Sequence, residues 1–251
     1  MSQETAKSVI PYPFSARFLP NDEIMPGIRY GRQDELLTPA YWAMRCVTAR
    51  PADIDFVSHH GTLKEEVGFC LLGGFGVTLE VATAFFECIR ARHAFERGVV
   101  MPEDAFLAML EKPATVHGRP HRYRYPAQRA RRLHRAMADL ERMQFDEDDP
   151  IKFREQIQTL DGVGPKTASW IARNWLGTDS VAILDIHILR AGWLLTLFDR
   201  ECRLPRDYLE LESLFLRFAK TLRVRASVLD SVMWHDMRTF GSNLARATLA
   251  V

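Results

Sequence analysis

The 251-residue sequence predicts an all-α protein, and three observations support that fold class. Apolar residues recur at helical spacing in nearly every segment after Pro39. Proline or a capping Ser, Thr or Asp stands at the start of most of these segments, as is typical of helix starts. Strand signals are nearly absent, since residues 180–184 are the single short run with β-like composition.

The predicted helices follow one another with short connections. Residues 1–38 carry four prolines and little periodicity, so we expect an extended segment there. The run 73–76 is too rich in glycine to remain helical. The last helix is expected to start at the capping-box-like Ser227-x-x-Asp230 and to end at Gly241. We expect helices over residues 39–47, 63–72, 78–89, 102–110, 126–143, 151–160, 165–175, 185–198, 205–218 and 227–241.

The composition is that of a soluble globular protein, with 47% hydrophobic and 26% charged residues. The longest charge-free stretch, 67–79, is too short and glycine-rich to span a membrane, which takes about 18 residues. The first residues lack the basic and apolar regions of a secretion signal. We therefore expect a cytoplasmic protein, associated with the nucleoid if the source is bacterial or archaeal. Four cysteines without a C-x-x-C pair suggest neither disulfides nor a zinc or iron–sulfur site.

The net charge of +1 conceals a basic strip. Residues 118–135 contain seven arginines and no acid, interleaved with two tyrosines, so the rest of the chain is net acidic. Arginine forks beside aromatic rings suit a phosphate-lined surface, and we expect Arg122, Arg124 and Arg129 to contact DNA. The alternative for these arginines is a solvated face.

A second candidate DNA contact is the turn Gly162-Val163-Gly164 between two predicted helices. Glycine forms such a tight turn most easily and lets a DNA backbone approach closely. The turn leads directly into a helix that begins with proline, whose N-terminal N–H groups are suited to a phosphate. The alternative is an ordinary helix–helix turn.

Lys166 and Asp185 are the candidate catalytic pair. Lys166 follows the turn on the first turn of the next helix, and Asp185 comes 19 positions later within the apolar run 181–189. A lone carboxylate in such a run is costly unless it is paired or caps a helix. A desolvated lysine can lose its proton and attack carbonyl-like carbons to give Schiff bases. Taken singly, these residues would be interpreted as a solvated lysine and a helix cap, but together, at this spacing, they favour catalysis.

These residues carry a resemblance to a known family. The pattern Leu-x-Gly-Val-Gly-x-Lys over 160–166, followed by Asp185, resembles the helix-hairpin-helix, Gly/Pro…Asp superfamily of DNA glycosylases. Within it, the lysine marks the branch that is both glycosylase and AP lyase. Segments 166–174 and 181–190 are similar in particular to the small archaeal-type 8-oxoguanine DNA glycosylases. Weaker likenesses extend the resemblance to roughly residues 63–240.

The resemblance implies a two-domain helix-hairpin-helix DNA glycosylase fold that binds double-stranded DNA containing a damaged base. Lys166 would attack the sugar C1′ and displace the base, and β-elimination from the resulting imine would nick the strand. Asp185 would orient or deprotonate Lys166, and His187 would either lie near a backbone phosphate or be a structural histidine. The resemblance implies no metal in the chemistry and no cofactor, apart from a candidate monovalent-cation site at the hairpin carbonyls.

Three aromatic residues are candidates for the base pocket or for a wedge in the base stack: Phe75 on the glycine-rich run, Trp170 and Trp234. The alternative for each is core packing. The small archaeal-type enzymes also read the oxidised purine through a C-terminal lysine. The last lysine here is Lys220, so that contact cannot be carried over.

We expect three parts along the chain. Residues 1–60 form an N-terminal segment and helix that pack with the C-terminal helices, 61–198 form a six-helix domain with the hairpin at about 151–175, and 199–251 complete the second domain. The expected function is a monomeric glycosylase/AP lyase for oxidised purines, most of all 8-oxoguanine. The alternatives are a glycosylase for another damaged base and a non-catalytic helix-hairpin-helix DNA-binding protein.

Overall fold

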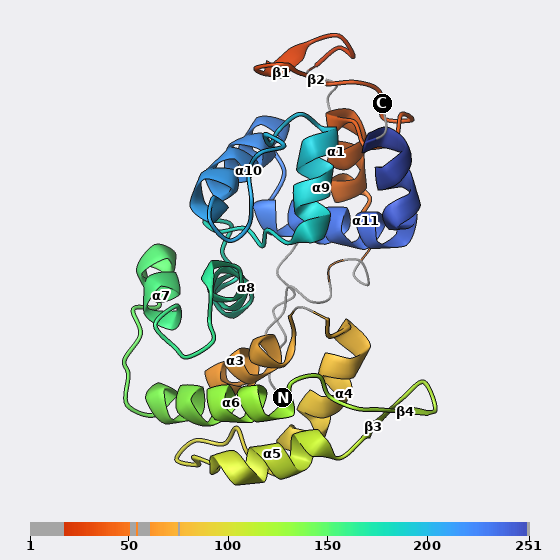
Figure 1. Ribbon diagram of the computed structural model, residues 1–251. Coiled ribbons are helices and arrows are strands. Elements are labelled where there is room, and N and C mark those ends of the chain that lie inside the picture. Colours follow the sequence, from red (N-terminus) through yellow and green to blue (C-terminus); the bar gives the residue numbers. More distant parts are fainter. Residues whose placement is uncertain (1–17, 51–53, 55–60, 75, 250–251) are drawn as a thin grey trace, which may run out of the picture.

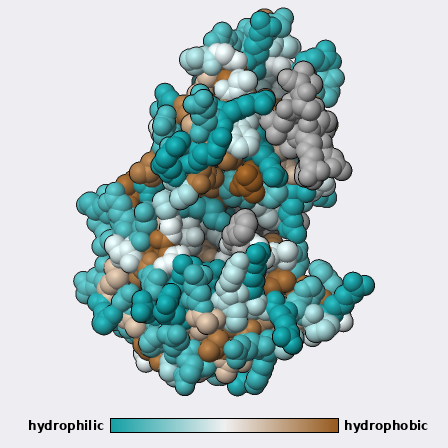
Figure 2. Space-filling model, viewed as in Figure 1, coloured by the Kyte–Doolittle hydropathy of each residue, from teal (hydrophilic) through white to brown (hydrophobic). Residues whose placement is uncertain are grey.

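The computed structural model describes residues 18–249 except 51–53, 55–60 and 75, with side chains described as far as Phe240. The described chain is mainly helical and forms two lobes, each around its own hydrophobic core (Figure 1). On the face seen in Figure 2 both lobes are mostly hydrophilic, and hydrophobic residues gather near the level where the lobes meet. No described helix has the length and apolar character needed to cross a membrane. The all-α prediction is confirmed.

The first lobe is built from consecutive helices around the almost completely buried α3, whose start is fixed by a capping box between Thr62 and Glu65. Its core combines Val67 and Leu72 of α3 with aromatic residues such as Phe86 and Phe106. The helices are α3 (Leu63–Leu72), α4 (Leu79–Arg90), α5 (Glu103–Glu111), α6 (Pro126–Leu140), α7 (Pro150–Ile157) and α8 (Pro165–Leu176).

The second lobe combines helices from both ends of the chain: α1 (Pro39–Val47), α9 (Ile186–Leu194), α10 (Tyr208–Leu222) and α11 (Ala226–Leu249). Asp236 of α11 accepts hydrogen bonds from the Tyr41 hydroxyl (2.7 Å) and from the Arg45 guanidinium (2.7 Å) of α1. Because α1 packs on α11, the described chain begins in this lobe, continues through the first lobe and then returns.

The two cores divide the chain before α9. Val181 belongs to the first core and Ala182 to the second, and Ile188 and Leu189 of α9 pack in the second core. The predicted boundary at residue 198 therefore differs from the division in apolar packing. The reason is that α9 buries its apolar side chains against α1 and α11, although the sequence leads into it directly from α8.

Two short antiparallel hairpins are the described strands: β1 (Glu23–Met25) with β2 (Ile28–Arg29), and β3 (Ala114–Val116) with β4 (Arg119–His121). Both use two-residue turns that contain glycine at positive φ, at Gly27 and Gly118. The β-like composition of 180–184 does not produce a strand. Its backbone N–H groups bond to side chains, as shown below.

Several helix ends differ from the sequence prediction. The last helix begins at Ala226 and continues through Gly241 to Leu249, so the predicted capping box and stop are wrong. The N–H of Ser227 donates instead to Asp179 Oδ1 (2.9 Å), because Asp230 is engaged with Arg173 of another helix. The helix expected over 185–198 ends at Leu194, and the one expected from 205 begins at Tyr208.

Candidate active site

The helix-hairpin-helix is formed by α7 and α8 with the turn 158–164 between them. Asp149 caps α7 by accepting from the N–H groups of Ile151 (3.0 Å) and Lys152 (3.2 Å). Gly162 adopts φ +85°, which L-residues rarely adopt. A Cβ at this position would lie 2.3 Å from Cδ of Arg132, so the turn needs glycine for conformation and for space.

The N-terminus of α8 is open. Gly164 is its N-cap and offers no side-chain cap, Pro165 follows at the first helical position, and a Cβ on Gly164 would meet nothing within 4 Å. Uncapped N–H groups at the positive end of a helix are suited to an anion such as phosphate. Val163 lies inside the turn, where its side chain is buried and its N–H donates to the Leu160 carbonyl (3.1 Å).

Lys166 projects from the first turn of α8, half-buried beside an aromatic ring. Its Nζ lies 5.8 Å from the ring centroid of Trp170, one turn further along the helix. Trp170 packs edge-on against Phe69 (6.0 Å between centroids) and lies close to the Gly73 backbone. Trp170 is thus both a core residue and the neighbour of the candidate nucleophile.

Asp185 is the N-cap of α9 through a single oxygen. Its Oδ1 accepts from the N–H groups of His187 (2.7 Å) and Ile188 (3.0 Å). Its Oδ2 receives no hydrogen bond from any described residue, and within the described chain no ion pair joins Asp185 to Lys166. One carboxylate oxygen is therefore fixed by the helix, and the other remains available.

His187 and Trp234 come together beside this cap. Their rings lie 6.3 Å apart at 83°, and the Arg238 guanidinium lies 5.1 Å from the centroid of the Trp234 ring. The His187 Nδ1 is buried and has no hydrogen-bond partner among the described residues. Arg238 also pairs with Glu80 of α4 (2.6 Å), which links the two lobes at this point.

The basic strip divides into exposed and bracing arginines. Arg122 and Arg124 are exposed, and the Arg124 guanidinium lies 4.9 Å from the Tyr125 ring centroid. Arg129 is partly buried and donates to the Gly73 carbonyl (3.3 Å), at the start of the glycine-rich run. The structure therefore gives Arg129 a role in supporting this loop.

Arg132 and Arg135 brace the hairpin from the same helix. Arg135 pairs with Asp161 (3.2 Å), and the Arg132 side chain lies against Gly162 with its Nε buried and without a hydrogen-bond partner among the described residues. Helix α6 thus supports both glycine-containing loops. This proximity brings the strip and the hairpin, which the sequence identified separately, to one place in the fold.

Phe75, the candidate wedge, lies outside the described residues. In the described part of the chain, no group of three or more His, Cys, Asp or Glu side chains is placed to hold a metal ion.

Sequence reasoning missed a set of buried charged residues next to the candidate pair. Glu212 and Asp230, at 4% and 2% exposure, pair with the buried guanidinium groups of Arg154 and Arg173. Burial raises the pKa of Asp230 to about 6, although Arg173 acts in the opposite direction. A signal was present in the sequence, because both carboxylates interrupt the apolar pattern of amphipathic helices.

Similarity to known proteins supports the resemblance. The family model for 8-oxoguanine DNA glycosylase (Ogg-HhH) matches residues 58–224. The 8-oxoguanine DNA glycosylase/AP lyases of Metallosphaera sedula and Methanocaldococcus jannaschii are 38% identical over 87 residues and 31% identical over 91 residues. These matches cover 35% and 36% of this chain, but only 42% and 44% of the relatives' own lengths.

The fold is also similar to a solved structure. The 8-oxoguanine DNA glycosylase of Thermotoga maritima superposes with a TM-score of 0.56 at 24% identity, covering 81% of this chain and 96% of that one. The helix-hairpin-helix glycosylase fold expected from the sequence is thereby confirmed. Because the family model spans more than half of the chain, including the hairpin, Lys166 and Asp185, this protein belongs to the 8-oxoguanine DNA glycosylase family.

Proposed function

We propose that this protein is a bifunctional DNA glycosylase/AP lyase that removes oxidised purines, 8-oxoguanine above all, from double-stranded DNA. The observation that carries the proposal is the placement of Lys166 on the first turn of α8, beside an open helix N-terminus. Asp185, with one oxygen uncommitted, supplies the second group. The names of the archaeal relatives, 8-oxoguanine DNA glycosylase/AP lyase, support the same activity.

In the proposed reaction the damaged nucleotide is flipped out of the duplex, because its glycosidic bond is inaccessible while the base is stacked. The Lys166 amine, once deprotonated, forms a bond to C1′ as the C1′–N bond to the base breaks and its electron pair leaves with the base. Loss of a proton from nitrogen and opening of the sugar give the Schiff base. Removal of the C2′ proton then expels the 3′ phosphate and nicks the strand.

Asp185 has two roles in the proposed reaction, one toward the Lys166 proton and one toward the charge that develops on the sugar. Its Oδ1 remains bound to the α9 N–H groups, while Oδ2 accepts the lysine proton or stabilises positive charge on the sugar. The Trp170 ring lies 5.8 Å from the Lys166 Nζ and covers one side of the amine.

DNA would be held at several phosphates around this pair. The N-terminus of α8 binds one phosphate, His187 lies near another, and the exposed Arg122 and Arg124 extend the contact. A monovalent cation would bind carbonyls of the hairpin beside the first phosphate. The protein acts as a monomer.

Borohydride trapping on duplexes with 8-oxoguanine or an abasic site tests the proposal. The wild-type protein is expected to form a covalent adduct with both, because borohydride reduces the Schiff base. Lys166→Gln should bind the same duplexes and form no adduct. Absence of an adduct from wild type, or equal trapping by Lys166→Gln, would show that the lyase mechanism is wrong. Duplexes with a single alkylated base or oxidised pyrimidine, assayed in parallel, identify the preferred lesion.

A further inference from the structure

The segment 177–185 connects the helix of Lys166 with the cap residue Asp185. Val181, Ala182 and Leu184 in this segment are buried, at 1% exposure or less, yet the segment belongs to no helix or sheet. Buried backbone N–H groups need acceptors, and without a neighbouring strand these must come from side chains.

Glu212 of α10 supplies one of these acceptors. Its Oε1 accepts from the Ala182 N–H (2.9 Å) and from the Ser169 hydroxyl (3.1 Å). Ser169 lies one turn after Lys166 on α8, and Ala182 lies three residues before Asp185. A single carboxylate oxygen thus joins the helix of the candidate nucleophile to the segment that ends in the candidate acid–base group.

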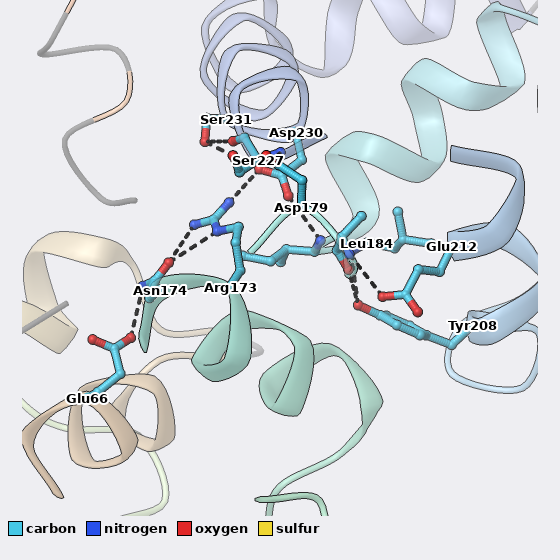
Figure 3. A network of polar contacts seen from close by, with 12 residues as sticks. Glu66, Arg173, Asn174, Asp179, Leu184, Tyr208, Glu212, Ser227, Asp230 and Ser231 are labelled. Carbon is cyan, nitrogen blue, oxygen red and sulfur yellow. Dashed lines mark hydrogen bonds and ion pairs between the residues drawn. The ribbon is translucent and has the colours of Figure 1, made fainter. Parts of the chain in front are cut away.

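Asp230 of α11 repeats this arrangement. Its Oδ2 accepts from the Ile183 N–H (3.1 Å), and its Oδ1 accepts from the guanidinium of Arg173, two turns after Lys166 on α8. Figure 3 shows these bonds converging on the extended segment, with Tyr208 on its other side. The Tyr208 hydroxyl donates to the Ala182 carbonyl (2.6 Å) and accepts from the Leu184 N–H (3.3 Å).

The same network reaches the first lobe. Arg173 donates to the Asn174 side-chain oxygen (3.1 Å from Nε and 3.0 Å from Nη2), and Asn174 donates to Glu66 Oε1 (2.9 Å) on α3. The network therefore connects α8 and the segment 177–185 to both lobes (Figure 3).

We propose that Glu212 and Asp230 are positioning residues that hold Asp185 at a fixed place relative to Lys166. Each carboxylate binds the lysine's helix with one contact and the segment before Asp185 with another. A well-packed apolar pair can be as stable as a buried ion pair, but it offers no acceptor for the Ala182 and Ile183 N–H groups. The catalytic consequence of this proposal rests on the proposed glycosylase function.

The test compares two buried carboxylates on the same helix. Asp230→Ala removes the acceptor for the Ile183 N–H in the segment 177–185. Asp236→Ala is the control, because the described partners of this α11 carboxylate are Tyr41, Arg45 and the neighbouring His235. Single-turnover excision of 8-oxoguanine and DNA affinity are measured at a temperature where each variant is folded. We expect Asp230→Ala to slow excision by up to about 100-fold with affinity within about twofold, since small misplacement of reacting groups has effects of this size. Asp236→Ala should retain the wild-type rate.

Glu212 provides a conservative rescue. Glu212→Gln keeps an acceptor oxygen for Ala182 and Ser169 and should excise within a fewfold of wild type, whereas Glu212→Ala should be slowed like Asp230→Ala. An Asp230→Ala variant with the wild-type excision rate would overturn the proposal. Equal slowing of the folded Asp230→Ala and Asp236→Ala variants would also overturn it, because general destabilisation would then be sufficient.

Amide hydrogen exchange of residues 178–190 separates this proposal from the proposed function. Exchange should be faster in Asp230→Ala and unchanged in Asp236→Ala, whether or not the protein excises 8-oxoguanine. If the wild-type protein releases no base, the proposed glycosylase function is wrong. The exchange result then still tests whether Asp230 fixes the position of the segment before Asp185. Unchanged exchange in Asp230→Ala would refute the positioning role.

Discussion

The two connections at the ends of α8 are built in opposite ways. The hairpin turn at its N-terminus contains Gly162 and Gly164, leaves the helix without a side-chain cap and meets open space at Gly164. The segment after its C-terminus is buried at Val181, Ala182 and Leu184, and the N–H groups of residues 182–184 bond to the side chains of Glu212, Asp230 and Tyr208. Backbone N–H groups without an acceptor in the protein indicate where a ligand can supply the acceptor. Backbone N–H groups that bond to side chains indicate where the position of the backbone is fixed. Lys166 follows the first connection, and Asp185 ends the second.

The largest expected effect comes from the residue at the end of the fixed connection. Asp185→Asn should reduce excision by about 10²–10⁴-fold, the usual contribution of a general acid or base. Because an asparagine oxygen still caps α9, the free energy of unfolding should change little. Asp185→Ala, which loses cap and chemistry together, should also be destabilised by about 1 kcal/mol. Single-turnover kinetics and urea unfolding measure the two effects. An active Asp185→Asn variant would remove Asp185 from the mechanism.

Alanine substitutions at the two glycines of the hairpin turn should have smaller effects, which differ between stability and DNA binding. Gly162→Ala should lose about 1–3 kcal/mol of stability, because its φ of +85° is strained for alanine and its Cβ meets Arg132. Gly164→Ala meets nothing within 4 Å, so its stability should fall by less, while its methyl group intrudes where a phosphate approaches. Urea unfolding and DNA titration of both variants measure this contrast. If Gly164→Ala binds DNA as tightly as the wild-type protein, the predicted phosphate contact at this end of α8 is wrong.

The smallest effects concern two carboxylates on opposite sides of the lobe junction. The hydrogen bond from Arg238 lowers the pKa of Glu80 to about 2, so its contribution is complete above pH 4.5 and is lost as pH falls toward 2. Burial raises the pKa of Asp230 from 3.8 to about 6, so its ionisation weakens the fold as pH rises through that interval. Unfolding curves against pH should therefore change at the acid end in Glu80→Gln and between pH 4 and 6 in Asp230→Asn. The Glu80 effect should stay below about 1 kcal/mol and shrink in high salt, because this pair is partly exposed. Identical pH profiles for the two variants would contradict this assignment.

The sequence was sufficient to predict that the helices exist, although not all of their ends, and to identify the candidate residues of the hairpin. Helical periodicity identified α3 and α4, and glycine, lysine and aspartate at fixed spacing identified the hairpin, Lys166 and Asp185. These signals are local, because each depends on residues that are near one another in the chain. The β3–β4 hairpin had a local signal as well, His117-Gly118 at the turn, which the helical periodicity around it obscured.

The fixed half of the site depends on distant partners. Ala182 and Glu212 are 30 residues apart, and Ile183 and Asp230 are 47 apart. The local composition of 180–184 favours a strand, and it is the approach of α10 and α11 that supplies other acceptors for its N–H groups. For the same reason Asp230, whose spacing from Ser227 suggests a helix cap, bonds to Arg173 of another helix. Such assignments follow only once the tertiary arrangement is known.

The order of synthesis gives the position of α1 a further consequence. The first lobe is one continuous stretch of chain, so it has all its helices as soon as α8 has left the ribosome, and we expect it to fold then as a unit. Helix α1 is made earlier but must wait for α11, since Tyr41 and its partner Asp236 are separated by 195 residues. During that wait the apolar face of α1, which includes Trp42, lacks the part of its native core that α9, α10 and α11 supply. The lobe that holds Asp185 is therefore completed after the first lobe, and its assembly depends on α11.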